Sequence, residues 1–239
     1  MIRKTIRAFA LLEVAIALSV LGVIAYMSMP LISKLQNWQQ TRVTTTHQEQ
    51  IMEALSAYVL ANKRLPCPAA NIGGAAQIGL NVGFVPYQTL GIAEKIAKDG
   101  NHHWMTYAVQ TSLASQDITN LQSIEGLSMD PRTIFCTTPA DGPLAINNYK
   151  NESCIVAPDF AAVVIISHGI SGGYYLDNGT VQPVSSADSH KIANATRAGN
   201  YVTKTTQRNE SNIFDDTVLF ASRNNLMSHW AKCPCRTPD

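Results

Sequence analysis

The chain is organised around residues 9–32, FALLEVAIALSVLGVIAYMSMPLI, an apolar run that contains a single carboxylate, Glu13. An α-helix rises about 1.5 Å per residue, so residues 9–26 alone would reach across roughly 27 Å. The hydrocarbon core of a bilayer is about 30 Å thick. We therefore predict a membrane-spanning helix close to the N-terminus.

The residues ahead of the run predict its orientation. The leader, residues 1–8, carries Arg3, Lys4 and Arg7 and no acidic residue. Positive charge beside a membrane span stays on the cytoplasmic side. We therefore expect the N-terminus inside the cell and the rest of the chain outside the cytoplasm.

Glu13 bears on what kind of segment this is. A cleaved signal peptide, with Val23-Ile24-Ala25 as a candidate cleavage site, needs only apolar residues. A plain uncleaved anchor likewise gains nothing from an acid, which costs about 2.5–3.5 kcal/mol at a helix centre and less near a helix end. The acid therefore favours a third kind of segment, in which the carboxylate has a role.

Residues 7–14, RAFALLEV, resemble the processing site of type IV pilins and type II secretion pseudopilins. The resemblance implies that a prepilin peptidase cuts between Ala8 and Phe9 and methylates the new amine. Two positions depart from the family pattern, because Ala8 stands where Gly is usual and Ala10 stands where a polar residue often follows the Phe. Ala is small, so we expect slow rather than absent processing. Pro30 matches the proline that pilins often carry near the end of this segment.

The resemblance also implies a role for Glu13 in assembly. Alone in lipid, this carboxyl group would be protonated or expelled, whereas beside the free amine of a neighbouring subunit's Phe9 it becomes half of an ion pair. Such a pair would set the register of each incoming subunit. The alternative is an acid close enough to the lipid headgroups for its side chain to reach water.

The apolar run is predicted to continue as one long helix over residues 9–62, with the membrane half at residues 9–32. Leu35, Trp38, Ile51 and Leu55 recur at helical spacing beyond Pro30. The prolines at positions 66 and 68 prevent the helix from continuing. The alternative is a break at residues 44–46, three β-branched threonines, which would give two shorter helices.

Residues 63–239 are predicted to form a globular head of α+β class, a small and mostly antiparallel sheet packed on the outer half of the helix. Residues 161–167 and 174–177 are expected to pair through the glycine-bearing connection between them. Residues 185–211 are polar and poor in large apolar residues, and they are expected to form an exposed loop or a disordered excursion. The remaining expected elements are strands at residues 104–110 and 217–221 and a short helix at residues 89–98.

Two short motifs in the head carry a second resemblance. RLPCPA at residues 64–69 and GFVPYQTLG at residues 83–91 resemble a group of pilin-like proteins of bacterial envelopes. Asp99-Gly100, ahead of residues 107–109, continues the likeness. This resemblance supports the fold more than any activity.

The overall charge argues against a nucleic-acid partner. The 239 residues have 46% hydrophobic composition and a net charge of +1, and loss of the leader leaves 15 of the 18 basic residues against 17 acidic ones. A near-neutral chain has no broad positive field for a polyanion. Arg197, Lys204 and Arg208 would allow a basic strip for DNA uptake, but we predict that they form a solvated face.

Five cysteines predict disulfides in an oxidising compartment. Cys136 and Cys154 flank a polar loop and are the preferred pair, whose closure contributes about 3 kcal/mol in the chain-entropy model. Cys67 is expected to join Cys233 or Cys235, which leaves one cysteine over.

Two metal sites are weaker interpretations. His229, Cys233 and Cys235 offer zinc ligands, although the oxidising compartment favours disulfides. Asp215 and Asp216, with Asp177 and Asn178, offer oxygen ligands for Ca²⁺, but no twelve-residue calcium loop is present. We predict no cofactor.

An enzymatic function has little support in the sequence. Cys67 with His168, or Ser167 and His168 with Asp177, supply the residue types of nucleophilic catalysis. Ser167 is not in a G-x-S-x-G turn, and residues 169–173 lack the Lys-Ser/Thr of a phosphate loop. We predict that the chain is not an enzyme.

The sequence as a whole predicts a structural subunit of a type IV pilus or a type II secretion filament. It would cross the bacterial inner membrane once, with the head in the periplasm, until assembly. Expected partners are the prepilin peptidase, other pilin-like subunits and the inner-membrane assembly platform. The alternative is an envelope adhesin or ligand-binding protein on an uncleaved anchor.

Overall fold

The computed structural model describes residues 3–62, 64–110, 113–114, 144–150, 153–154, 159–208, 212–221 and 225–226. Within the N-terminal helix the described side chains are those of residues 13–27 and 35–62. The chain forms two compact units, residues 1–42 and residues 43–239.

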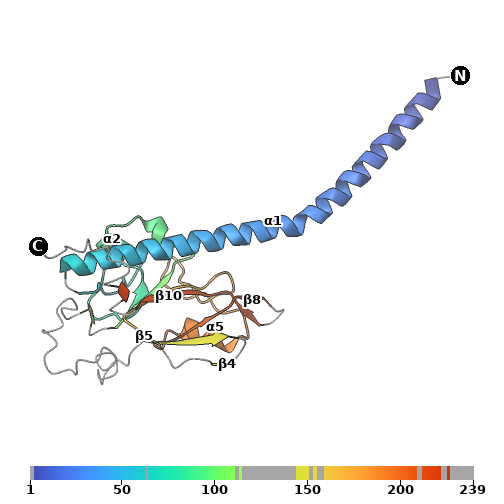
Figure 1. The fold of residues 1–239 in the computed structure, drawn as a ribbon. Helices are drawn as coiled ribbons and strands as arrows, with labels where there is room; N and C mark the ends of the chain where they lie inside the picture. The colour runs from blue at the N-terminus through green and yellow to red at the C-terminus, as the bar shows by residue number, and fades with distance from the viewer. Residues whose placement is uncertain are drawn as a thin grey trace, which may run out of the picture. The chain divides into compact units, whose positions relative to one another are not determined.

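Helix α1 (Arg3–Asn62) is continuous, so the alternative of two helices with a break at residues 44–46 is wrong (Figure 1). A β-branched residue costs up to about 0.7 kcal/mol in a helix, and packing in the fold readily outweighs that cost. Thr44 is buried, and its hydroxyl accepts a hydrogen bond from the Gly100 N–H at 2.9 Å. This part of α1 is therefore held by the head itself.

The helix also includes the segment that the sequence predicted to lie in a membrane. Ala8, Phe9 and Pro30 are part of α1, but their side chains lie outside the described residues. Within the described part of the chain, no helix combines the length and the apolar character that a membrane span needs.

The main sheet of the head is antiparallel throughout, which confirms the predicted α+β class. Its strand order is β1-β2-β6-β10, with β6 paired to both β2 and β10. All five residues of β6 are buried, and the strand lies within the predicted strand segment at residues 161–167. The strands are β1 (Val82–Phe84), β2 (Thr106–Val109), β6 (Val163–Ser167) and β10 (Thr217–Ala221).

A second sheet is built around β3 (Leu144–Lys150). This strand pairs antiparallel with β4 (Ser153–Cys154) and β5 (Asp159–Ala161), and parallel with β7 (Asn200–Lys204). A short ribbon pairs β8 (Gln207–Arg208) with β9 (Ile213–Phe214). The head therefore contains more than the single sheet that the sequence predicted.

The prediction that residues 185–211 form an exposed loop is wrong, both in structure and in burial. It forms α5 (Ser189–Thr196), followed by β7 and β8. Asp188 caps α5 by accepting hydrogen bonds from the backbone N–H groups of His190 and Lys191. The segment folds inward because its polar side chains find partners there, which composition alone does not reveal.

Two other local predictions are wrong. The helix expected at residues 89–98 is divided into α2 (Tyr87–Leu90) and a 3₁₀ turn, η1 (Glu94–Ala97), because Gly91 ends α2 in the left-handed conformation at φ 69°. Residues 174–177 form no strand with β6. Instead, Tyr175 makes isolated bridges to Trp104 and Val181.

One stripe of α1 lies in the core of the head. Ile51, Met52, Leu55 and Val59 are fully buried and belong to the same apolar cluster as residues of β2 and β6. Gln48, 1% exposed, donates its amide hydrogens to the carbonyls of Ile165 at 3.3 Å and Thr217 at 2.9 Å. The helix is therefore tied to the sheet by apolar packing and by a buried amide.

Replacing Gln48 by Glu should destabilise the head by at least about 2 kcal/mol, because the near-isosteric carboxyl group would face two carbonyl oxygens. Gln50→Glu is the matched control, since Gln50 lies on the exposed side of the same helix and surface changes usually stay within about 0.5 kcal/mol. Urea unfolding of the full-length chain in detergent measures both. Equal losses in the two variants would contradict this role of Gln48.

Candidate functional site

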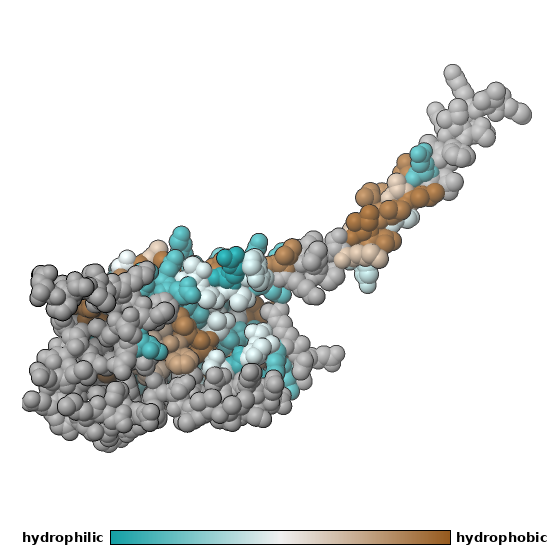
Figure 2. Space-filling model, in the orientation of Figure 1, coloured by the Kyte–Doolittle hydropathy of each residue, from teal (hydrophilic) through white to brown (hydrophobic). Residues whose placement is uncertain are grey.

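The N-terminal unit presents an apolar helical surface with one charge. Every side chain of residues 13–27 is exposed within the unit, including Ile16 at 58% and Leu18 at 63%. Figure 2 shows the corresponding hydrophobic atoms gathered on this part of α1. Soluble monomers rarely expose apolar patches of such continuity, so this surface is suited to lipid or to another protein.

Glu13 is the sequence-predicted assembly residue whose side chain is described. It carries the only charge among residues 13–27, and it lies one helical turn after Phe9. The described residues provide it with no ion-pair partner. A partner for this carboxylate would therefore come from another molecule or from residues outside the described part.

The cysteine pairings stay predictions. Cys67 is half-buried against the main core, and it forms no disulfide with a described cysteine. Cys154 belongs to β4, but its side chain lies outside the described residues. Cys136, Cys233 and Cys235 also lie outside them, together with the candidate zinc ligand His229.

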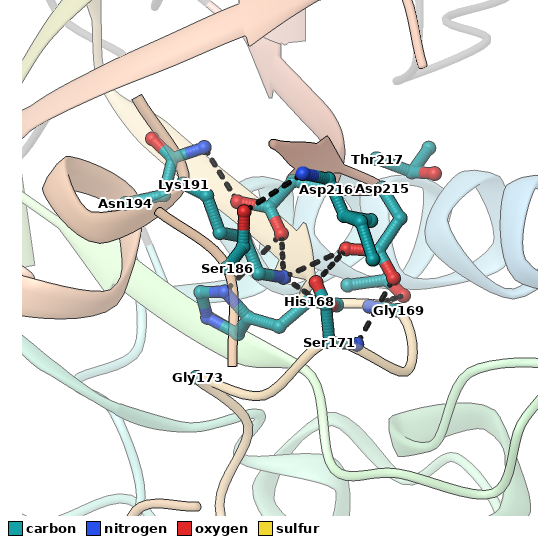
Figure 3. A network of polar contacts seen from close by, with 12 residues as sticks. His168, Gly169, Ser171, Gly173, Ser186, Lys191, Asn194, Asp215, Asp216 and Thr217 are labelled. Atoms are coloured by element: carbon teal, nitrogen blue, oxygen red, sulfur yellow. Dashed lines mark hydrogen bonds and ion pairs between the residues drawn. The ribbon is translucent and has the colours of Figure 1, made fainter. Parts of the chain in front are cut away.

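The head contains a buried ionic network that the sequence did not predict. Lys191 of α5 reaches Asp216 with its Nζ, lies 3.0 Å from Asp215 Oδ1 and donates to the carbonyl of His168 (Figure 3). The side chains of Lys191 and Asp216 are 0% exposed and that of Asp215 is 4% exposed. Asp188, as the N-cap of α5, fixes the turn from which Lys191 extends.

Asn194 extends the network from α5 to β7. Its Nδ2 donates to Asp216 Oδ2 at 2.7 Å and to the carbonyl of Val202 at 3.0 Å, while its Oδ1 accepts from the Val202 N–H at 2.7 Å. The side chain is fully buried. The Asn194 amide thus orients Asp216 and joins α5 to β7 within the polar segment.

Asp215 is held as an anion by several donors. Its Oδ2 accepts from the N–H groups of Ile170 and Ser171 at 2.8 and 3.0 Å, and the Ser171 hydroxyl donates to Oδ1. Burial acts to raise the pKa of Asp215, but Lys191 and these hydrogen bonds outweigh it and lower the pKa below its ordinary value. A Cβ at Gly169 would lie 2.4 Å from Asp215 Oδ2, so this turn requires glycine.

His168 lies beside the network with its ring fully buried. Its Nε2 lies 2.9 Å from Thr106 Oγ1, and its Nδ1 lies 3.7 Å from Asp216 Oδ1 with no hydrogen-bond partner among the described residues. Burial is the main cause that lowers the pKa of His168, with Lys191 and Arg197 adding to it and Asp216 opposing it. The folded head therefore favours a neutral imidazole.

The residues weighed for catalysis have other partners. Ser167 Oγ donates to Asp99 Oδ2 at 2.6 Å, and Asp177 accepts from Trp104 Nε1 at 2.6 Å. The structure therefore does not assemble Ser167, His168 and Asp177 into a hydrogen-bonded triad.

The candidate calcium ligands also have other partners. Asp215 and Asp216 face Lys191 rather than Asp177. In the described part of the chain no three His, Cys, Asp or Glu residues are grouped to hold a metal ion.

The prediction of a solvated basic face at Arg197, Lys204 and Arg208 is wrong for the two residues whose side chains are described. Arg197 lies over the ring of Tyr175, with its Cζ 4.2 Å from the ring centroid. Lys204 pairs with Asp188 at 3.0 Å, and its side chain is 4% exposed. The Arg208 side chain lies outside the described residues. Two of the three cations proposed for a DNA strip therefore serve internal contacts.

No family model, curated protein or solved structure matches this chain. The case for function thus rests on the residues themselves. The sequence held one usable signal for the missed network, which is Asp188 as an N-cap ahead of a short helix with Lys191 and Asn194 on one side.

Acidification should weaken the head through His168. The unfolded chain takes up a proton near the ordinary His pKa of 6.5, whereas the folded head resists it. The stability is therefore present above that pH and is lost as pH falls from 6.5 toward the lowered pKa. The Asp215 contribution is lost in a separate window, below its ordinary pKa of 3.8.

Urea midpoints of the full-length chain between about pH 7.5 and 5 measure this effect, since the slope reports proton uptake on unfolding. His168→Asn should flatten the pH dependence, whereas the exposed His102→Asn should leave it unchanged. An unchanged slope in His168→Asn would show that another group is responsible.

Proposed function

We propose that this chain is a pilin-like subunit that assembles into a type IV pilus or type II secretion filament through its N-terminal helix. The observation that carries the proposal is the exposed apolar surface of residues 13–27 with Glu13 as its single charge. In this proposal the prepilin peptidase cuts between Ala8 and Phe9. The subunit is held in the bacterial inner membrane, with its head in the periplasm, until the assembly platform adds it to the filament.

Cleavage would create a partner for Glu13, which has no ion pair among the described residues. The new α-amine of Phe9 is a cation on the same type of helix, and a neighbouring subunit can bring it to the Glu13 carboxylate. In a low dielectric such a pair is much stronger than in water, while either charge alone would be costly. Apolar packing of residues 14–27 would then supply the buried contact area between subunits. The ion pair would set the register of one subunit against the next.

The construction of the head supports a mechanical role. The part of α1 that belongs to the head is fixed by buried apolar side chains and by Gln48, so a load on this helix reaches the sheet directly. A ligand-binding head on an uncleaved anchor does not require such a connection.

The mature chain should begin at Phe9 with a methylated amine. Mass spectrometry of the protein purified from membranes of a host that has a prepilin peptidase checks this start. A host lacking the peptidase is the control, in which the leader, residues 1–8, should remain on the chain. A start at Tyr26 in the first host would indicate a signal peptide and would contradict the proposal.

Replacing Glu13 by Ala should abolish incorporation into filaments while the protein stays in the membrane, because the partner of the Phe9 amine is lost and apolar character increases. Ser19→Ala is the matched control, since the Ser19 hydroxyl donates to the carbonyl of Ala15 in its own helix. Fractionation of membranes and sheared filaments measures both variants. Normal incorporation of Glu13→Ala would contradict the assembly role.

A further inference from the structure

Three buried side chains of the head have the composition needed to form a covalent cross-link. The amine of Lys191 contacts the carboxylate of Asp216, and a second carboxylate, that of Asp215, lies 3.0 Å from the same nitrogen. Figure 3 shows Lys191 extending from α5 to the two aspartates that precede β10. Since both Lys191 and Asp216 are 0% exposed, bulk water does not separate the amine from the carbon it would attack.

We propose that Lys191 and Asp216 condense to an isopeptide bond. A bond forms between Lys191 Nζ and Asp216 Cγ, and the bond from Cγ to Oδ1 breaks. Before the attack, the Lys191 ammonium passes one proton to Asp216 Oδ1, which leaves a neutral amine with a free lone pair and a neutral carboxyl group. The nitrogen loses a second proton during the attack, and both protons leave with Oδ1 as one molecule of water. Asp215 takes a proton from Nζ as the new bond forms and passes it to the departing oxygen, so no oxidant, nucleotide or other reagent is required.

Burial favours the product over the ion pair. A buried ion pair pays a desolvation cost for each charge, and a neutral amide does not. The partners of the amide are already in place, because the His168 carbonyl accepts from Nζ and the Asn194 amide donates to Asp216 Oδ2 at 2.7 Å. Asp215 would keep its donors from Ile170 and Ser171.

A second ion pair in the same region provides an internal comparison. Lys204 Nζ lies 3.0 Å from Asp188 Oδ2, and both side chains are largely buried. Among the described residues, however, Lys204 pairs with that one carboxylate and has no second acid to relay a proton. We therefore expect Lys204 to remain a free amine while Lys191 is consumed.

The cross-link would tie α5 to the start of β10 and enclose β7 within a covalent loop. A chain closed in this way cannot separate these elements when it unfolds. The inference concerns the chemistry of the head, and it holds whether or not the chain assembles into a filament.

Mass spectrometry of the reduced full-length chain tests the proposal. The intact protein should be lighter than its sequence by one water molecule. Trypsin should fail to cut after Lys191, so residues 151–197 should appear joined to residues 209–223, while cleavage after Lys204 stays normal. Lys191→Met should restore the full mass and release residues 209–223 as a linear peptide.

Asp215→Asn tests the relay, because it keeps both reacting groups and removes the carboxylate beside them. Lys191 should then stay largely unreacted. The wild-type digest decides the matter even where a variant fails to fold. A peptide that ends at an unmodified Lys191, or a link from Lys191 to Asp215, would overturn the proposal. Full cross-linking in Asp215→Asn would overturn the assigned relay.

Discussion

Ile51, Met52, Leu55 and Val59 place one face of α1 in the core that also contains the inner faces of β2 and β6. Each such side chain contributes about 1.5–3 kcal/mol when it is fully buried, so this contact alone is comparable with the net stability of a domain. A sheet whose apolar face stayed in water would not be stable. Helix α1 thus forms one side of the core of the head, and the remaining elements pack around this core.

β6 connects this core to a second one. Successive side chains of a strand point to opposite faces, and Val163 and Ile165 enter the core with α1 while Val164 and Ile166 enter a cluster with Tyr201 of β7. The strand must therefore be apolar on both faces. Because β7 supplies Tyr201 to this second cluster, the polar segment before it is drawn into the fold.

The sequence allowed the α+β class, the apolar strand at β6 and the strand at β10 to be predicted, because each depends on local pattern. The buried network did not follow from pattern. Lys191 and Asn194 are ordinary surface residues by composition, and their burial depends on Asp215 and Asp216, which lie some twenty residues further along the chain. Polar burial is decided by partners brought together in the fold, and a sequence read in order does not display those partners.

The two units differ in how they satisfy their side chains. In the described part of the head, a core of apolar side chains is buried, and the buried Lys191 is paired with a carboxylate. In α1, residues 14–27 leave their apolar groups uncovered, and nothing in the requirements of the head explains why. Lipid would cover these groups but would give Glu13 no partner. A second helix with a free amine would satisfy both, which is why a single carboxylate in an apolar run argues for assembly rather than for anchoring alone.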